Sequence, residues 1–247
     1  MDPVARAKPT RDIITVVSRR WPRAILIAGF GAMCGSLYAC GAMSGPPPPI
    51  LNDKVIAAVK ANDVVAVRTL LQQGAPVNAR GSGEGSDEGY TALLYAVEHH
   101  FLPLTQLLLR SGADPTLPAG TQNVFPLLKA ARAGERDMLV LLLDYGANIN
   151  QKRPGDGMDA LAVACREGHL TIVDMLVARN AAVEPQDLRY AIGAGHVEVA
   201  RRLLDAGADP AWSFNGRTMS QVARESPDRM RSDLEALLQR YAARQNR

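Results

Sequence analysis

The feature that most constrains the fold is a spacing that recurs five times along the chain. An alanine is followed four residues later by a turn-type residue, and twelve residues after that by a glycine or asparagine stop. The five sets are Ala58/Asn62/Gly74, Ala96/His100/Gly112, Ala130/Gly134/Gly146, Ala164/Gly168/Asn180 and Ala191/Gly195/Gly207. Self-similarity at a fixed period of roughly 20–50 residues is typical of a repeat architecture. A stack of similar units is therefore expected.

The segments between turn and stop predict helices that pack in pairs. Residues 107–109 and 139–143 are apolar nearly all round, and such a helix must be covered on more than one face. Neighbouring pairs in a stack supply that cover. Glycine at the stop suits the left-handed conformation that ends a helix. Residues suited to the start of a helix are Thr91, Asp159 and Thr218 as N-caps and Pro126 in the first turn.

The helix starts carry a resemblance to a known family. Three of them read Thr91-Ala92-Leu93-Leu94-Tyr95-Ala96, Phe125-Pro126-Leu127-Leu128-Lys129-Ala130 and Asp159-Ala160-Leu161-Ala162-Val163-Ala164, with weaker copies at Gln186 and Thr218. They resemble the ankyrin repeat, which has about 33 residues, a Thr-Pro-Leu-His-x-Ala start and two helices. The family's His is absent from every copy. The resemblance covers 53–225 and implies an all-α ankyrin-repeat solenoid of five to six helix-turn-helix repeats, with 226–247 as a C-terminal capping helix.

The same resemblance implies a β-turn-like loop, called a finger here, between each second helix and the next first helix. Counted from stop to helix start, the fingers span 17, 13, 13, 6 and 11 positions. The first contains residues 80–89, with four glycines and four charges; it is either an adaptable acidic contact loop or a tolerated surface insertion. The fourth, between Asn180 and Gln186, is nearly deleted, which predicts a notch in the row of fingers.

Ankyrin proteins generally bind partners through finger tips and the exposed face of the first helices. Mapped onto this chain, the resemblance implies these partner-binding residues: Asp87, Glu88, Tyr90, Glu98, His99, Arg132, Met158, Arg166, Glu167, Trp212, Phe214 and Arg217. Trp212 and Phe214 stand out because aromatic residues are only 5% of the chain, and aromatic and Arg side chains commonly anchor interfaces. The alternative for Trp212 is packing beneath the finger against the last repeat.

The first forty residues predict an export signal. Arg19, Arg20 and Arg23 precede the uncharged run 24–39, which is the charge order of a secretory signal. The run ends in Leu37-Tyr38-Ala39-Cys40, which resembles the lipobox of bacterial lipoproteins. That resemblance implies a lipoprotein signal peptide over 1–39 and acyl chains on Cys40. The alternatives are an uncleaved membrane anchor over 24–43 and a twin-arginine signal at residues 18–20.

The residues after Cys40 suggest a location and a tether. Gly41, in place of Asp, implies sorting to the outer membrane facing the periplasm, with the inner membrane as the alternative. Residues 40–52 contain Pro46-Pro47-Pro48-Pro49, which favour a polyproline II spacer and exclude a helix there.

Little in the sequence points to chemistry. Residues 1–39 hold six basic and two acidic side chains, so the remaining 22 basic and 23 acidic ones nearly balance and give no nucleic-acid footprint. Three cysteines make no disulfide framework, and Cys165 is expected to be a small buried thiol. His99 and His100 are adjacent, so on a helix they point about 100° apart and suit one metal poorly. No catalytic motif occurs, and no metal, cofactor or catalytic residue is expected.

The expected function is non-catalytic binding of a protein partner at the bacterial envelope, by a monomer held to a membrane through lipid. One specific alternative is an immunity lipoprotein that neutralises a secreted antibacterial toxin, such as a phospholipase effector. A second is an envelope scaffold. An enzyme is disfavoured, because the repeat plan supplies no buried titratable pair.

Overall fold

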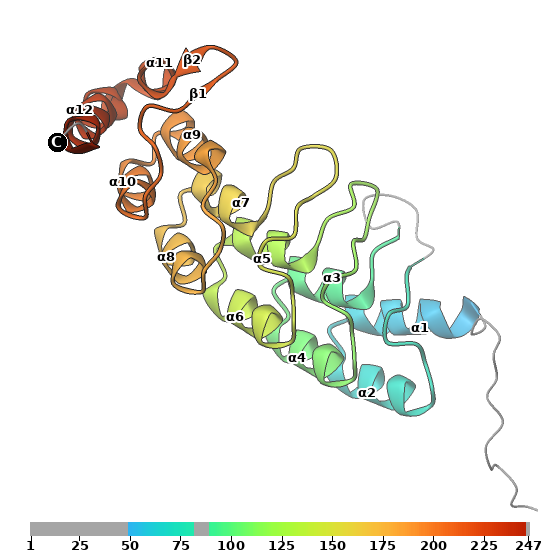
Figure 1. The fold of residues 1–247 in the computed structure, drawn as a ribbon. Coiled ribbons are helices and arrows are strands. Elements are labelled where there is room, and N and C mark those ends of the chain that lie inside the picture. The colour runs from blue at the N-terminus through green and yellow to red at the C-terminus, as the bar shows by residue number, and fades with distance from the viewer. Residues whose placement is uncertain (1–48, 82–88, 246–247) are drawn as a thin grey trace, which may run out of the picture. The chain divides into compact units, whose positions relative to one another are not determined.

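The computed structural model describes residues 49–81 and 89–245, which form six helix pairs and one short β-hairpin (Figure 1). The first helices of the pairs are α1 (Pro49–Lys60), α3 (Ala92–Glu98), α5 (Pro126–Ala133), α7 (Ala160–Glu167), α9 (Pro185–Ala194) and α11 (Met219–Glu225). The second helices are α2 (Val64–Gln72), α4 (Leu102–Arg110), α6 (Arg136–Asp144), α8 (Leu170–Ala178), α10 (Val197–Asp205) and α12 (Asp228–Gln245). The all-α solenoid of paired helices is confirmed.

Backbone conformation follows the repeat spacing. All five turn positions have positive φ, from 52° at Asn62 to 82° at Gly195, and all five stop positions do too, from 61° at Asn180 to 97° at Gly207. Glycine and asparagine reach this region at little cost, which explains why they recur there. His100, with φ 62°, is the exception in residue type. The sequence period therefore marks the two places in each repeat where the chain reverses.

The core lies between the helices of successive repeats. Each first helix contacts the next along the chain, from α1 through α11, and α2–α4, α4–α6, α8–α10 and α10–α12 contact in the same way. Leucines from both helix rows are fully buried, among them Leu93, Leu127 and Leu161 from the first row and Leu108 and Leu142 from the second. Each repeat thus covers its neighbour's apolar surface, as in other solenoids.

Predicted caps begin the helices. The side chains of Thr91, Asp159 and Thr218 accept hydrogen bonds from the backbone N–H three residues later, at 3.1, 2.9 and 3.3 Å. Pro126 is the first residue of α5. These caps satisfy backbone donors that a helix start leaves free.

Hydrogen bonds join the fingers to one another at their bases. Asn78 accepts from the Asp114 backbone N–H at 2.9 Å, Gln151 donates to the Thr116 carbonyl at 3.2 Å, and Asn150 accepts from the Ala182 N–H at 2.9 Å. The first and second fingers are also linked, because Arg80 donates to the Pro118 carbonyl at 2.9 Å. These hydrogen bonds therefore fix the position of each finger base relative to the next one.

The predicted notch in the finger row is present. Only residues 179–184 separate α8 from α9, whereas 145–159 separate α6 from α7. Figure 1 shows long loops between α4 and α5 and between α6 and α7, and a short link between α8 and α9. The fifth finger carries the hairpin of β1 (Ser213–Phe214) and β2 (Arg217–Thr218).

The helical boundaries differ from the sequence expectation at the N-terminal side. Helix α1 begins at Pro49, so residues 49–52 are helical, and the exclusion of a helix there was wrong for this stretch. Proline has a fixed φ that suits the first helical position, where its missing N–H costs nothing. The lipobox, Cys40 and the other three prolines lie outside the described residues. No helix within the described residues is both long and apolar enough to cross a membrane.

Candidate binding surface on the fingers and first helices

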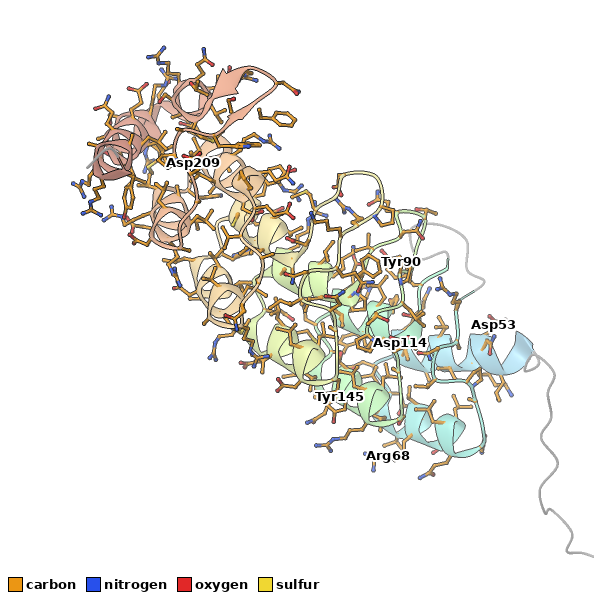
Figure 2. The ribbon with its side chains drawn as sticks, in the orientation of Figure 1. Asp53, Arg68, Tyr90, Asp114, Tyr145 and Asp209 are labelled. Atoms are coloured by element: carbon orange, nitrogen blue, oxygen red, sulfur yellow. The ribbon has the colours of Figure 1, made fainter. Side chains whose placement is uncertain are left out.

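The candidate binding surface consists of the fingers and the exposed faces of the first helices. Near the first and second fingers it contains an aromatic ring, Tyr90, and an ion pair between Lys129 and Glu98. Tyr90 packs its ring over Gly120 of the second finger, where a β-carbon would lie 2.5 Å from the ring. Lys129 lies 5.9 Å from the centre of the Tyr90 ring and donates to Glu98 Oε1 at 2.7 Å. Figure 2 shows Tyr90 among the finger loops, whereas Arg68 lies on α2, at the lower side of the view and away from these loops. Tyr90 and Glu98 are half-buried.

Of the other expected residues in this part of the chain, His99 is exposed at the end of α3. Its ring lies 4.2 Å from that of Tyr95 and 5.8 Å from that of Phe101, measured between centroids. Asp87 and Glu88 lie outside the described residues. His99 therefore belongs to a small aromatic row at the turn between α3 and α4. The acidic part of the first finger stays a prediction.

Arg132, Arg166 and Glu167 come together in the middle of the surface. Arg166 donates to Glu167 Oε1 at 2.8 Å, and Arg132 Nε lies 3.6 Å from the same oxygen. These guanidinium groups lower the pKa of Glu167, with the hydrogen bond from Arg166 as the main cause. Met158 was expected to be exposed here, but it is 3% exposed and accepts from Arg166 Nη1 through its sulfur at 3.3 Å. The exposure of Met158 was wrongly predicted because its side chain joins the hydrophobic core.

Trp212, Phe214 and Arg217 lie on the fifth finger. Trp212 is half-buried and packs against the core, and its ring lies 6.0 Å from that of Phe214. Phe214 is 40% exposed, and Arg217 is exposed and paired with Glu225. Of the two alternatives for Trp212, the structure therefore shows packing beneath the finger. Phe214 and Arg217 face outward.

Phe214 and Arg217 form one wall of a groove of about 410 Å³, and Arg166 also lines it. This is called the arginine groove below. Its remaining lining is supplied by Arg189, Tyr190, Gly193 and Ala194 of α9 and by Val222 and Glu225 of α11. Three of the residues expected from the sequence therefore meet at one concave site.

Two carboxylates beneath the notch are buried and have raised pKa values, so the expectation that the repeat plan supplies no buried titratable pair was wrong. Asp187 is 1% and Asp159 3% exposed, and burial raises the pKa of both, that of Asp187 to about 7. Asp187 accepts from the Glu184 N–H at 2.7 Å as half of a capping box at the start of α9. Glu184 is paired with Lys152, whose hydrogen bond lowers the pKa of Glu184. Both aspartates therefore accept hydrogen bonds from backbone N–H groups at helix starts, Asp159 at the start of α7 and Asp187 at that of α9.

The remaining candidates for chemistry have structural roles. Nε2 of His169 lies 2.9 Å from the Arg132 carbonyl, and Nε2 of His196 lies 3.1 Å from that of Arg166, so each ring bridges to the preceding repeat. Cys165 is buried, and its burial raises the pKa of its thiol well above the usual range. Within residues 49–81 and 89–245, no three His, Cys, Asp or Glu side chains are placed to share a metal ion. The described surface is arranged for recognition by charge, aromatic contact and shape.

Comparison with known proteins agrees with this geometry. The family described as ankyrin repeats (3 copies) matches residues 117–187, and that described as ankyrin repeats (many copies) matches 55–109. The two matches together cover about half of the sequence. The chain is an ankyrin repeat protein.

Its curated relatives share the repeats over part of their length. It is 26% identical over 198 residues to ankyrin repeat protein nuc-2 of Neurospora crassa, covering 74% of this chain and 18% of that protein. It is 36% identical over 96 residues to ankyrin repeat and KH domain-containing protein mask of Drosophila melanogaster, covering 39% and 2%. With ankyrin repeat and SOCS box protein 6 of Mus musculus it shares 31% over 140 residues, covering 53% and 33%. The chain therefore spans a third or less of the length of these relatives.

Ankyrin repeat domains are typically non-catalytic and bind other proteins, so the repeats indicate protein binding here. Sequence reasoning missed several residues of the surface, namely Lys129, Arg153, Arg189 and Tyr190. Arg189 occupies the position of the ankyrin His, which is filled by the buried residues Leu94, Leu128 and Ala162 in three other copies and by the exposed Gln221 in the last. A long charged residue at a usually buried position was the signal that could have marked it.

Proposed function

We propose that this ankyrin repeat protein is a non-catalytic binding module, lipid-anchored at Cys40 on the periplasmic face of a bacterial outer membrane. The observation that carries the binding role is the in-phase stack of first helices and fingers, which leaves Arg132, Arg166, Phe214 and Arg217 on its surface. Rigid repeats hold these side chains in place before a partner arrives, which reduces the entropy lost on binding.

The anchor rests on the sequence. Arg19, Arg20 and Arg23 before an uncharged run, followed by Leu37-Tyr38-Ala39-Cys40, support export and lipidation. Several acyl chains would hold the protein firmly, because each buried methylene contributes about 0.8 kcal/mol. Tethering raises the local concentration of the module near partners at the same membrane.

Binding is tested by affinity capture of the full chain from an envelope extract, followed by mass spectrometry. Arg132→Glu, on α5, should lose most of the captured partner, because it reverses a 54% exposed charge on the proposed surface. Arg136→Glu is the matched control, since Arg136 is 65% exposed but belongs to α6 in the second row. Equal loss with both variants, or no specific partner with the unmodified chain, would argue against the proposed surface.

The anchor is tested by metabolic labelling with radioactive palmitate in cells that express the full chain. Cys40→Ala should abolish incorporation, and Cys34→Ala, which changes a nearby cysteine in the same uncharged run, should leave it intact. Unchanged incorporation in Cys40→Ala would contradict the lipoprotein proposal, while the binding role would still stand on the repeats.

A further inference from the structure

The arginine groove lies where the row of fingers is interrupted. Its floor is the face of α9 that carries Gly193 and Ala194, whose lack of bulk leaves the space open. The finger before α9 has only residues 179–184, and none of them lines the groove. The groove's volume of about 410 Å³ lies within the range of roughly 300–1,000 Å³ found for ligand sites.

Basic side chains outnumber acidic ones in the lining of the groove. Its lining holds three arginines, Arg166, Arg189 and Arg217, and a single carboxylate, Glu225. Arg217 is paired with Glu225, and Arg166 with Glu167 just outside the lining. Among the described residues, no carboxylate is recorded within ion-pair distance of Arg189, so its charge is the one left uncompensated.

Aromatic rings hold Arg189 in position. Its guanidinium carbon lies 4.4 Å from the centre of the Tyr190 ring and 4.8 Å from that of Phe214, both within the distance of cation–π attraction. Its Nε is buried and has no hydrogen-bond partner among the described residues. The terminal Nη1 and Nη2 groups are not buried in this way and make no hydrogen bond within the described residues, so they are the donors that an incoming acceptor would meet. The planar guanidinium is thus oriented and still able to donate.

We infer that the arginine groove binds an acidic segment of a partner protein, with a carboxylate on Arg189 and an apolar side chain against Phe214 and Tyr190. Guanidinium and carboxylate match in a two-hydrogen-bond geometry, which favours this chemistry. A nucleic acid fits less well, because beyond residue 39 the basic and acidic side chains balance and offer no extended basic footprint. The inference rests on the proposed protein-binding function and names the chemistry of the partner.

The probe is a display library of random 12-residue peptides, selected on the purified full chain. Selected peptides should be enriched in Asp and Glu. The best of them, fluorescently labelled, should bind at least tenfold more tightly than the same peptide with its Asp and Glu changed to Asn and Gln. A lack of acidic enrichment, or equal affinity of the two peptides, would overturn the inference.

Variants of the chain assign the site. Arg189→Gln should weaken binding of the acidic peptide at least tenfold, whereas Arg229→Gln, an exposed arginine of α12 outside the groove, should leave it unchanged. Gly193→Leu should also weaken binding, because the larger side chain narrows the groove without changing its charge. Gly193 is exposed and lies within α9, so the variant should keep its fold, which circular dichroism checks. Unchanged binding in both Arg189→Gln and Gly193→Leu would overturn the assignment.

The groove and the general binding role can fail separately. A partner captured from the envelope that stays bound to Arg189→Gln but is lost with Arg132→Glu would leave the binding function standing and overturn the groove as its acidic-segment site. Loss of the partner with Arg189→Gln, together with acidic peptide selection, supports both.

Discussion

At the scale of single residues, Asp187 is hydrogen-bonded and yet poorly placed for its charge. It accepts from the Glu184 N–H, but burial and the nearby Asp159 and Glu184 raise its pKa to about 7. An acid whose pKa is higher in the folded state binds protons more strongly when folded. This group's contribution to stability is therefore full below pH 4, and is lost as the pH rises from about 4 to 7.

Asp187→Asn should consequently raise the free energy of unfolding at pH 8 and change it little at pH 4. The uncharged amide keeps an oxygen acceptor for the cap and removes a buried charge. The gain is up to about 4 kcal/mol, since the pKa is raised by about three units at about 1.4 kcal/mol each. Urea denaturation of both proteins from pH 4 to 8 measures it. A difference that does not vary with pH would contradict the raised pKa of Asp187.

Replacing Gly168 and Gly146 by alanine separates the cost of a strained backbone from the cost of a steric clash with a neighbouring side chain. Gly168 has φ 80°, and a β-carbon there would lie 2.5 Å from the His196 ring, whereas Gly146 has φ 91° with nothing within 4 Å. Gly146→Ala should cost about 1–2 kcal/mol through backbone strain alone. Gly168→Ala should cost at least 1 kcal/mol more, roughly the value of the His196 hydrogen bond that must shift.

Thermal or urea denaturation compares the two glycine variants. The double variant Gly168→Ala/His196→Ala removes the obstructing ring, so Gly168→Ala should be less harmful in the His196→Ala background. Equal costs for Gly146→Ala and Gly168→Ala would show that His196 moves freely and does not hold the turn.

At the scale of elements, α12 closes the stack: it contacts α10 and α11, and its Leu234 is completely buried. Leu234→Ala should lower the free energy of unfolding by about 2–5 kcal/mol, because it leaves a cavity in a packed site. Gln239→Ala, at an exposed position of the same helix, should change it by less than about 0.5 kcal/mol. Urea denaturation followed by circular dichroism measures both. A small effect of Leu234→Ala would mean that α12 is not a stabilising cap.

Elements were predictable where short-range rules set them. The positions of the turns, the caps at Thr91 and Asp159 and the shortened fourth finger followed from local residue types. The hairpin of the fifth finger was missed, although Asn215-Gly216, with φ 50° and 76°, is a strong signal for a two-residue β-turn. The start of α1 at Pro49 was missed because the run of four prolines was interpreted as a spacer, although a proline such as Pro126 was expected to begin a helix.

At the scale of the whole molecule, each repeat is stabilised by its neighbours, so inner repeats have two partners and outer ones have one. Hydrogen exchange measured by mass spectrometry should therefore show the slowest exchange in α5–α8 and faster exchange in α1–α2 and α11–α12. Protection that is uniform from α1 to α12 would instead indicate one cooperative unit without the graded behaviour of a nearest-neighbour array.

The amino-acid sequence by itself determined the period, the two reversals in each repeat and the family, because turns and caps depend on residues a few positions apart. Only the tertiary structure decided that Met158 is buried, that Asp159 helps to raise the pKa of Asp187, and that Arg189 meets Phe214. The two pairs, Asp159 with Asp187 and Arg189 with Phe214, are 25 or more positions apart and belong to different repeats. Which side chains meet is set by the offset between stacked helices, which no local pattern encodes.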